Sequence, residues 1–173
     1  MKNPINKIIL EGPDLSGKTT LYNRLHRATD FKWNIQDRSA LSMLVYAKLY
    51  NRPEFMHVER LNSEINNLNN QIVILLPDWE VIVNRFYQRG DELQNFVSLK
   101  KVYDLFSEAA EEISSLPNVT VLTNEVDDFM INALIDGYHA VENSSFASMA
   151  DRCLIAASTG KNLGELFHDN SYM

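Results

Sequence analysis

A glycine-rich segment near the start of the chain carries the residues best suited to phosphate chemistry. Residues 11–20 read EGPDLSGKTT and match G-x-x-x-x-G-K-[ST] at every fixed position. An apolar run at residues 7–10 predicts a buried strand before the motif, and residues 21–26 predict a helix after it. This order presents backbone N–H groups to one concavity, which suits a polyanion. The sequence therefore predicts a phosphate-binding loop; the alternative is a glycine turn that matches by chance.

The motif assigns separate roles in holding ATP and Mg²⁺. We expect the Lys18 ammonium to reach the β- and γ-phosphates and the Thr19 hydroxyl to hold Mg²⁺. Residues 12–17 are called the glycine loop below. The expected ATP-binding residues are Gly12, Pro13, Asp14, Leu15, Ser16, Gly17, Lys18, Thr19 and Thr20.

A second polar group, Asp37-Arg38-Ser39, directly follows a predicted strand at residues 31–36. Ligands of parallel sheets bind beyond the carboxyl ends of the strands, so we expect this triplet to share a crevice with the glycine loop. There an aspartate accepts a proton from an acceptor hydroxyl or holds Mg²⁺ through water, and an arginine clamps an anionic acceptor. The alternative is a surface Asp–Arg pair, with Ser39 capping the next helix.

Two arginines stand four residues apart at the end of a predicted helix. Arg85 and Arg89 precede Gly90-Asp91-Glu92. Phosphoryl transfer spreads negative charge over the equatorial oxygens, which mobile arginines neutralise. We therefore expect this helix to act as a lid. The alternative is that both arginines are solvated and pair with Glu80 or Asp91.

The elements that position these residues alternate along the chain. Alternation of strands and helices predicts an α/β fold, a P-loop three-layer sandwich with a parallel sheet of about four to five strands covered by helices. The expected strands are residues 7–10, 31–36, 71–76 and 119–122, and the expected helices are residues 21–26, 41–50, 55–68, 79–88, 97–116 and 128–135.

Length and composition predict one intracellular domain over residues 1–173. The core covers about residues 7–135, and an extension from about residue 138 has no assigned role, although residues 147–157 suit a helix. No apolar stretch approaches the roughly 20 residues that span a bilayer, and no signal peptide is apparent. The single cysteine, Cys153, is typical of a reducing cytosol. We expect a cytoplasmic protein without a membrane partner.

Charge is distributed unevenly. Residues 1–100 carry 13 basic and 11 acidic side chains, whereas residues 101–173 carry 3 basic and 12 acidic ones. The acidic excess therefore lies in the C-terminal part of the chain, away from the phosphate-binding motif in the sequence. No strongly basic run, which would indicate binding of nucleic acid by charge alone, is visible in the sequence.

Taken in order, the motifs resemble those of the thymidylate kinase family of P-loop nucleotide kinases. The resemblance covers about residues 7–135 and implies an ATP- and Mg²⁺-dependent kinase. It implies catalytic roles for Lys18, Asp37, Arg38, Arg85 and Arg89, and metal binding by Thr19 and Asp37. It rests on Glu11-Gly12-x-Asp14-x-x-Gly17-Lys18-Thr19-Thr20, on Asp37-Arg38-Ser39 followed by Ser42 and Tyr46, and on Arg85-x-x-x-Arg89-Gly90.

The acceptor side departs from that family. Only residues 21–36 separate the motif from Asp37, whereas members that phosphorylate free thymidylate have a longer segment there. The shorter form is similar to viral members, some of which phosphorylate 5-hydroxymethyl-deoxyuridine within DNA during thymidine hypermodification. The resemblance thus favours 5-hydroxymethyluracil-containing DNA as the acceptor, whereas the net charge of −7 favours the alternative, free deoxynucleoside monophosphates.

A non-kinase P-loop module is the third reading. The strand at residues 71–76 ends in Leu76-Pro77 rather than in an acidic metal ligand, which weakens it.

Aromatic side chains near the triplet are candidates for stacking on a pyrimidine. Tyr46 and Tyr50 lie one turn apart on the helix after Arg38, and Trp33 lies on the preceding predicted strand. His57 and Arg60 follow in the next segment. The alternative for the rings, and the favoured one for Trp33, is packing in the core.

Overall fold

The protein is described by a computed structural model that covers residues 7–89 and 95–143, with side chains of the last helix described through residue 136. The predicted helix at 147–157, most of the extension from residue 138, and Gly90-Asp91-Glu92 lie outside the described residues. In chain order the elements are β1 (Lys7–Glu11), α1 (Lys18–Ala28), β2 (Ile35–Asp37), α2 (Ala40–Leu49), α3 (Phe55–Asn66), β3 (Asn70–Leu75), α4 (Trp79–Arg89), α5 (Phe96–Ile113), β4 (Val119–Leu122) and α6 (Asp128–Asn143).

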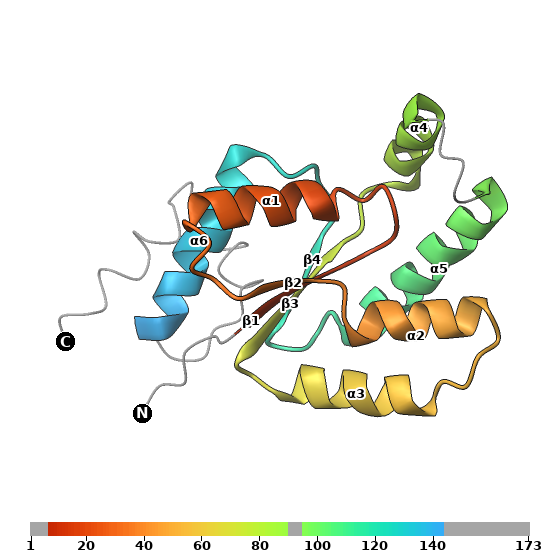
Figure 1. Ribbon diagram of the computed structural model, residues 1–173, viewed down its shortest axis with the longest axis horizontal. Coiled ribbons are helices and arrows are strands. Elements are labelled where there is room, and N and C mark those ends of the chain that lie inside the picture. Colours follow the sequence, from red (N-terminus) through yellow and green to blue (C-terminus); the bar gives the residue numbers. More distant parts are fainter. Residues whose placement is uncertain (1–6, 90–94, 144–173) are drawn as a thin grey trace.

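A four-stranded parallel sheet in the order β2-β1-β3-β4 forms the centre of the fold (Figure 1). β1 pairs with β3 from Lys7 opposite Asn70 to Glu11 opposite Ile74. All six residues of β3 are buried, because a central strand of a parallel sheet is covered on both faces. The predicted α/β class and parallel sheet are confirmed.

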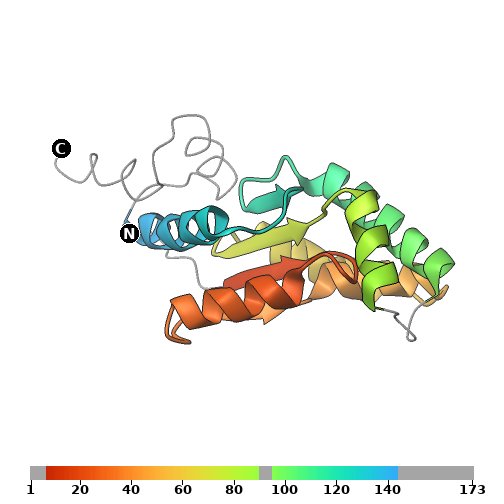
Figure 2. The ribbon, with the colours of Figure 1, turned by 90° about the horizontal axis from the view of Figure 1, so that it is seen from above.

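Helices cover both faces of this sheet, as Figure 2 shows from above. One face packs on α1 and α6 through side chains that include Leu21, Leu25 and Leu134. The other packs on α2, α3 and α5 through side chains that include Leu41, Leu61 and Phe106. Each fully buried aliphatic side chain contributes roughly 2 kcal/mol by leaving water. The two cores fix the strands, and hence the loops that leave their carboxyl ends.

The predicted strand at residues 31–36 was wrong in its first half. The strand is Ile35–Asp37, and the chain before it turns tightly after α1. Asp30 and Phe31 adopt positive φ of 51° and 57°, and the Phe31 N–H donates to the His26 carbonyl at 2.8 Å. Pairing with β1 begins only where the Ile8 N–H donates to the Asn34 carbonyl. Capping of α1 therefore overrides the alternating pattern of residues 31–34.

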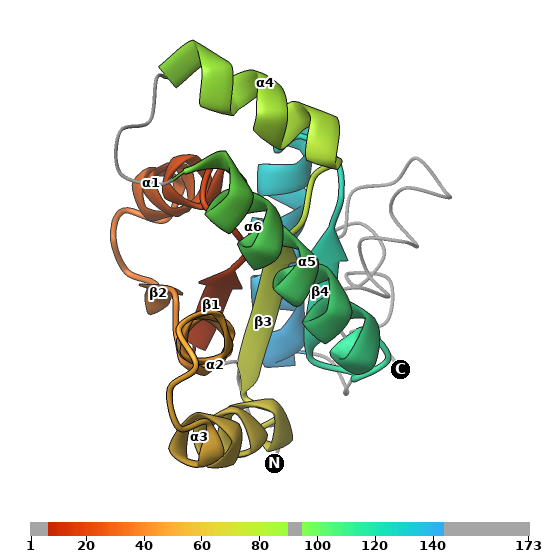
Figure 3. The same ribbon diagram turned by 90° about the vertical axis from the view of Figure 1, so that its right-hand side faces the viewer.

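Helix α4 lies beyond the carboxyl ends of the strands, apart from the sheet (Figure 3). Ile82 is its one fully buried side chain. Aromatic rings of α4 contact rings of α5: the ring centres of Trp79 and Tyr103 are 5.2 Å apart, and those of Phe86 and Phe96 are 5.7 Å apart. A helix attached by so few core contacts opens at lower free energy than the sheet, which suits the predicted lid.

The glycine loop passes directly over the end of β3. Gly12 has a φ of 137°, and a Cβ at this position would overlap the Leu75 carbonyl oxygen. Gly17 also has a positive φ, 98°, yet a Cβ there would meet only the Arg85 guanidinium at 3.6 Å. The first glycine is therefore required by space and by conformation, whereas the second is required by conformation alone.

We expect Gly12→Ala to destabilise the protein more than Gly17→Ala. Both variants adopt a disfavoured backbone conformation, which costs on the order of 1–3 kcal/mol. Gly12→Ala adds a collision with backbone that costs roughly 1–3 kcal/mol more. Urea unfolding of the two variants measures the difference. Equal loss of stability would show that the loop is not pressed against β3.

Candidate active site

A cavity of about 840 Å³ opens at the carboxyl edge of the sheet. The glycine loop and the start of α1 form one wall, α2 and the start of α3 form a second, and α4 with Glu125 and Val126 forms a third. Such a volume is within the range of about 300–1,000 Å³ found for ligand sites. The cavity lies where ligands of open parallel sheets bind.

The lining is cationic although the whole chain carries a net charge of −7. Among the described residues, five basic side chains line the cavity, and only Asp14 and Glu125 oppose them. The basic residues are Lys18, Arg38, Arg52, Arg85 and Arg89. Clefts with this charge concentrate anions. The sequence did not reveal this local excess, because its members lie up to 71 residues apart.

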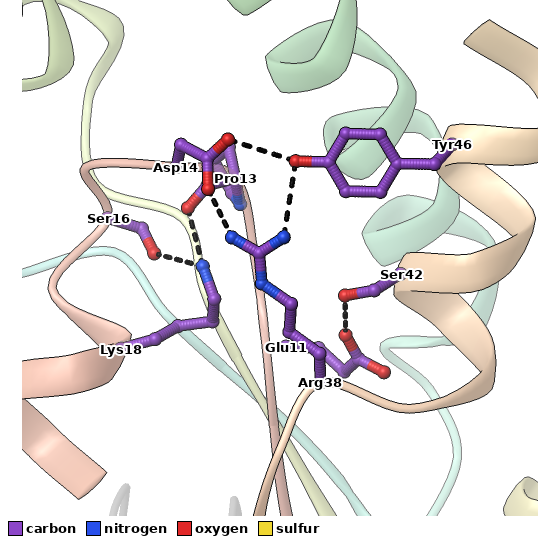
Figure 4. A network of polar contacts seen from close by, with 8 residues as sticks. All are labelled: Glu11, Pro13, Asp14, Ser16, Lys18, Arg38, Ser42 and Tyr46. Carbon is purple, nitrogen blue, oxygen red and sulfur yellow. Dashed lines mark hydrogen bonds and ion pairs between the residues drawn. The ribbon is translucent and has the colours of Figure 1, made fainter. Parts of the chain in front are cut away.

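Lys18 is 5% exposed and lies inside the glycine loop, as predicted (Figure 4). Its Nζ donates to the Pro13 carbonyl at 2.7 Å and to the Ser16 hydroxyl at 3.4 Å. Burial, with the nearby Arg38 guanidinium second, lowers the pKa of Lys18 from 10.5 to about 8. Its two hydrogen-bond acceptors are neutral, and the nearby carboxylates of Asp14, Asp37 and Glu11 favour the charged form without outweighing burial and Arg38, so a phosphate would stabilise the ammonium further.

Arg38 connects the triplet to the glycine loop. Its guanidinium forms an ion pair with Asp14 and donates to the Tyr46 hydroxyl at 3.4 Å (Figure 4). Tyr46 in turn donates to Asp14 Oδ2 at 3.0 Å. Burial, with the Asp14 carboxylate second, raises the pKa of Tyr46 to about 12, so the phenol stays protonated. Arg38 has a φ of 67°, and its N–H donates to the Leu10 carbonyl at 2.9 Å.

Asp37 is exposed at the end of β2, opposite Leu10 of β1. It is beside the cavity rather than among its lining residues. Its carboxylate is nonetheless close enough to Lys18 to favour the charged ammonium. The structure thus brings Asp37 and Arg38 to the same edge as the glycine loop, with Arg38 facing the cavity.

Arg85 lies over the glycine loop. It donates to the Leu15 carbonyl at 2.8 Å and to Glu125 Oε1 at 2.9 Å. Its ion-pair partner therefore follows β4 and is not Glu80, one of the partners considered from the sequence. Arg89 also lines the cavity. Both arginines of α4 thus line the cavity, and Arg85 contacts the glycine loop.

Two buried carboxylates hold the start of α2, and the sequence had not assigned them a role. Glu11 accepts hydrogen bonds from the Ser39 N–H at 2.8 Å and from the Ser42 hydroxyl. Glu64 accepts from the Ser39 hydroxyl and from the Ala40 N–H at 3.3 Å. Ser39 is the N-cap residue, as considered from the sequence, but its own side chain does not cap the helix.

Burial raises the pKa of Glu11 above 4.5, while the Ser42 and Ser39 hydrogen bonds oppose that rise. The position of Glu11 directly before the motif is the one sequence signal for this network. Glu64 gave none, because it lies 53 residues from Glu11.

Of the two Mg²⁺ ligands expected from the sequence, Thr19 lines the cavity and Asp37 lies beside it. Thr19 is the second residue of α1. The part of the chain that the structure describes holds no cluster of three or more His, Cys, Asp or Glu. Mg²⁺ does not need such a cluster, because it keeps several waters and is bound mainly by phosphates and one or two protein groups.

Comparisons of the chain with protein-family models, curated proteins and solved structures found no match. Within the described residues, no helix has the length and apolar character needed to cross a bilayer.

The lowered pKa of Lys18 predicts that ATP binding depends on pH. With a pKa of about 8 in the free protein, the ammonium loses its charge as the pH rises from 7 to 9. A polyanion such as ATP would bind the charged form, so we expect its affinity to fall about tenfold over this interval. In Lys18→Arg the positive charge persists at every pH in this range. The affinity for ATP should then no longer fall with rising pH, even if the substitution changes its absolute value. Calorimetric titration with ATP at each pH measures both slopes, and identical slopes would contradict the assignment.

Proposed function

We propose that this protein is a kinase that transfers the γ-phosphoryl group of ATP, with Mg²⁺, to a hydroxyl of a nucleotide acceptor. The observation that carries the proposal is the Lys18–Asp14–Arg38 arrangement in one cationic cavity. Lys18 and Arg38 come from the two motifs expected to hold donor and acceptor; Arg38 forms an ion pair with Asp14, and the Asp14 carboxylate also favours the charged form of Lys18. Two cations from separate motifs in one cavity could each hold one of the two anions between which a phosphoryl group passes.

The donor is held by the glycine loop and the start of α1. The loop and the first N–H groups of α1 face the cavity, and the helix dipole adds positive potential there. In this proposal Lys18 exchanges the Pro13 carbonyl for phosphate oxygens, and the Thr19 hydroxyl binds Mg²⁺. When bound there, Mg²⁺ would supply positive charge against the β- and γ-phosphates.

The acceptor lies toward Arg38 and α2. Its hydroxyl oxygen attacks the γ-phosphorus, a new P–O bond forms, and the bond to the β–γ bridging oxygen breaks to release ADP. The hydroxyl proton passes to the Asp37 carboxylate, directly or through water. Arg85 stabilises the transferring group from α4 after leaving Glu125, since it already lies against the glycine loop.

Among acceptors, we propose a pyrimidine deoxynucleotide, with 5-hydroxymethyl-deoxyuridine in DNA favoured and a free monophosphate as the alternative. The short segment between α1 and β2 supports the polymer. It contributes no lining residue between Thr20 and Arg38, so that side of the cavity has no wall from it.

Transfer from γ-labelled ATP tests the proposal. Hydroxymethyluracil-containing single strands and free thymidylate are supplied as parallel acceptors. Lys18→Ala should abolish labelling. Asp37→Asn should lower turnover by about 10²–10⁴-fold with little change in ATP affinity, because a general base acts mainly in the transition state.

Arg27→Ala, an exposed change on α1, is the matched control and should retain full activity. If the wild-type protein labels neither acceptor, or if Lys18→Ala labels either one normally, the protein is not this kinase.

A further inference from the structure

The outer rim of the cavity has no part in the donor site described above. Tyr50, Arg52 and His57 line it, at the end of α2 and the start of α3. Asn51 adopts a φ of 52°, and the Arg52 N–H donates to the Ala47 carbonyl at 2.8 Å. This left-handed turn brings Arg52 back beside the last turn of α2. The residues that connect α2 to α3 therefore form part of the rim.

Tyr46 of α2 and Tyr50, the C-cap residue of that helix, are each paired with an arginine. The Arg38 guanidinium lies 5.6 Å from the centre of the Tyr46 ring, and the Arg52 guanidinium lies 5.1 Å from that of Tyr50. The two rings are nearly parallel, at 17°, with centres 6.4 Å apart. An aromatic face beside a cation therefore occurs twice, once within the cavity and once at its rim.

The second pair differs from the first in being available to a ligand. Arg38 is neutralised by Asp14, and Tyr46 is hydrogen-bonded to the same carboxylate. Arg52 forms no ion pair with any residue that the structure describes, and Tyr50 is 57% exposed. An exposed ring next to an unneutralised guanidinium is the combination that binds a base by stacking and its phosphate by charge.

In the proposed kinase the acceptor unit lies beside Arg38, so the Tyr50–Arg52 pair would serve a second nucleotide unit. A free mononucleotide has one base and one phosphate group, so one pair would serve it and the other would have no partner. A strand has a base and a phosphate in each unit. Together with the cationic lining in an acidic chain, this repetition favours a polymeric acceptor.

We propose that Tyr50, Arg52 and His57 form a binding site for the nucleotide adjacent to the acceptor in single-stranded DNA. The neighbouring base stacks on Tyr50, and the connecting phosphate lies against Arg52 and His57. This inference rests on the proposed function, because it places the acceptor unit itself beside Arg38. It makes the rim the feature that selects a strand over a free nucleotide.

Fluorescence anisotropy of a labelled oligothymidylate, titrated with each variant, tests the rim directly and needs no phosphoryl transfer. Tyr50→Ala and Arg52→Gln should each weaken binding on the order of 10- to 100-fold, the loss expected for one stacked base or one phosphate contact. Tyr50→Phe keeps the stacking face and should bind as the wild type does. Arg52→Gln should also reduce the salt dependence by about one phosphate contact.

Phe31→Ala and Arg27→Gln remove an exposed ring and an exposed cation from α1 and the turn after it, and are the matched controls. They should leave strand binding unchanged. All variants should bind a non-hydrolysable ATP analogue as the wild type does. Unchanged strand binding in both rim variants would overturn the proposal, as would equal losses in the controls.

The outcomes also separate the two proposals. Loss of strand binding in the rim variants without any phosphoryl transfer by the wild type would refute the kinase and keep the strand site. Phosphoryl transfer that is equally efficient on free thymidylate and insensitive to both rim variants would keep the kinase and refute the strand site.

Discussion

The buried carboxylate of Glu11 fixes the distance between the two halves of the candidate site. It ends β1, immediately before the glycine loop, and it accepts hydrogen bonds from Ser39 and Ser42 at the start of α2. One residue therefore joins the loop that faces Lys18 to the helix that carries Tyr46 and Tyr50. Taking an ionised carboxylate out of water costs several kcal/mol unless it is well bonded, so this connection persists only while its donors are in place.

Glu64 extends the same arrangement to α3. Its contacts with Ser39 and Ala40 tie the helix that carries His57 to the helix that carries the tyrosines. Both carboxylates lie at the N-terminus of α2, where the helix dipole favours negative charge. The rigid part of the site is thus held by buried hydrogen bonds. Among the described residues, Arg85 on α4 has as polar partners the Leu15 carbonyl and Glu125, which is largely exposed. This difference in anchoring supports the proposal that α4 acts as a lid over the proposed donor and acceptor walls.

The features predicted from sequence are those set by local pattern. The buried strand before the motif, the apolar run of β3 and the amphipathic helices were placed correctly because each depends on its own residues. The strand at residues 31–34 was wrong, because its alternation is overridden by the turn that ends α1. The pairing of Arg85 with Glu125, across 40 residues, was not predictable, since it depends on how α4 sits over the loop.

The rim of the cavity also depends on contacts that the local sequence pattern does not predict. Tyr50 was identified as a stacking candidate from its spacing to Tyr46, but Arg52 was not, because only the left-handed Asn51 places it beside the ring. The cationic character of the cavity was hidden for a related reason. Its basic residues are scattered between residues 18 and 89, and only the fold gathers them at one edge of the sheet.

Isothermal titration calorimetry with a non-hydrolysable ATP analogue and Mg²⁺ shows whether the cavity binds the phosphoryl donor, whatever the acceptor is. We expect one site per chain that depends on Mg²⁺, and we expect the analogue to raise the melting temperature of the wild-type protein but not of Lys18→Ala. No binding heat with the wild-type protein, or equal binding by Lys18→Ala, would contradict this expectation.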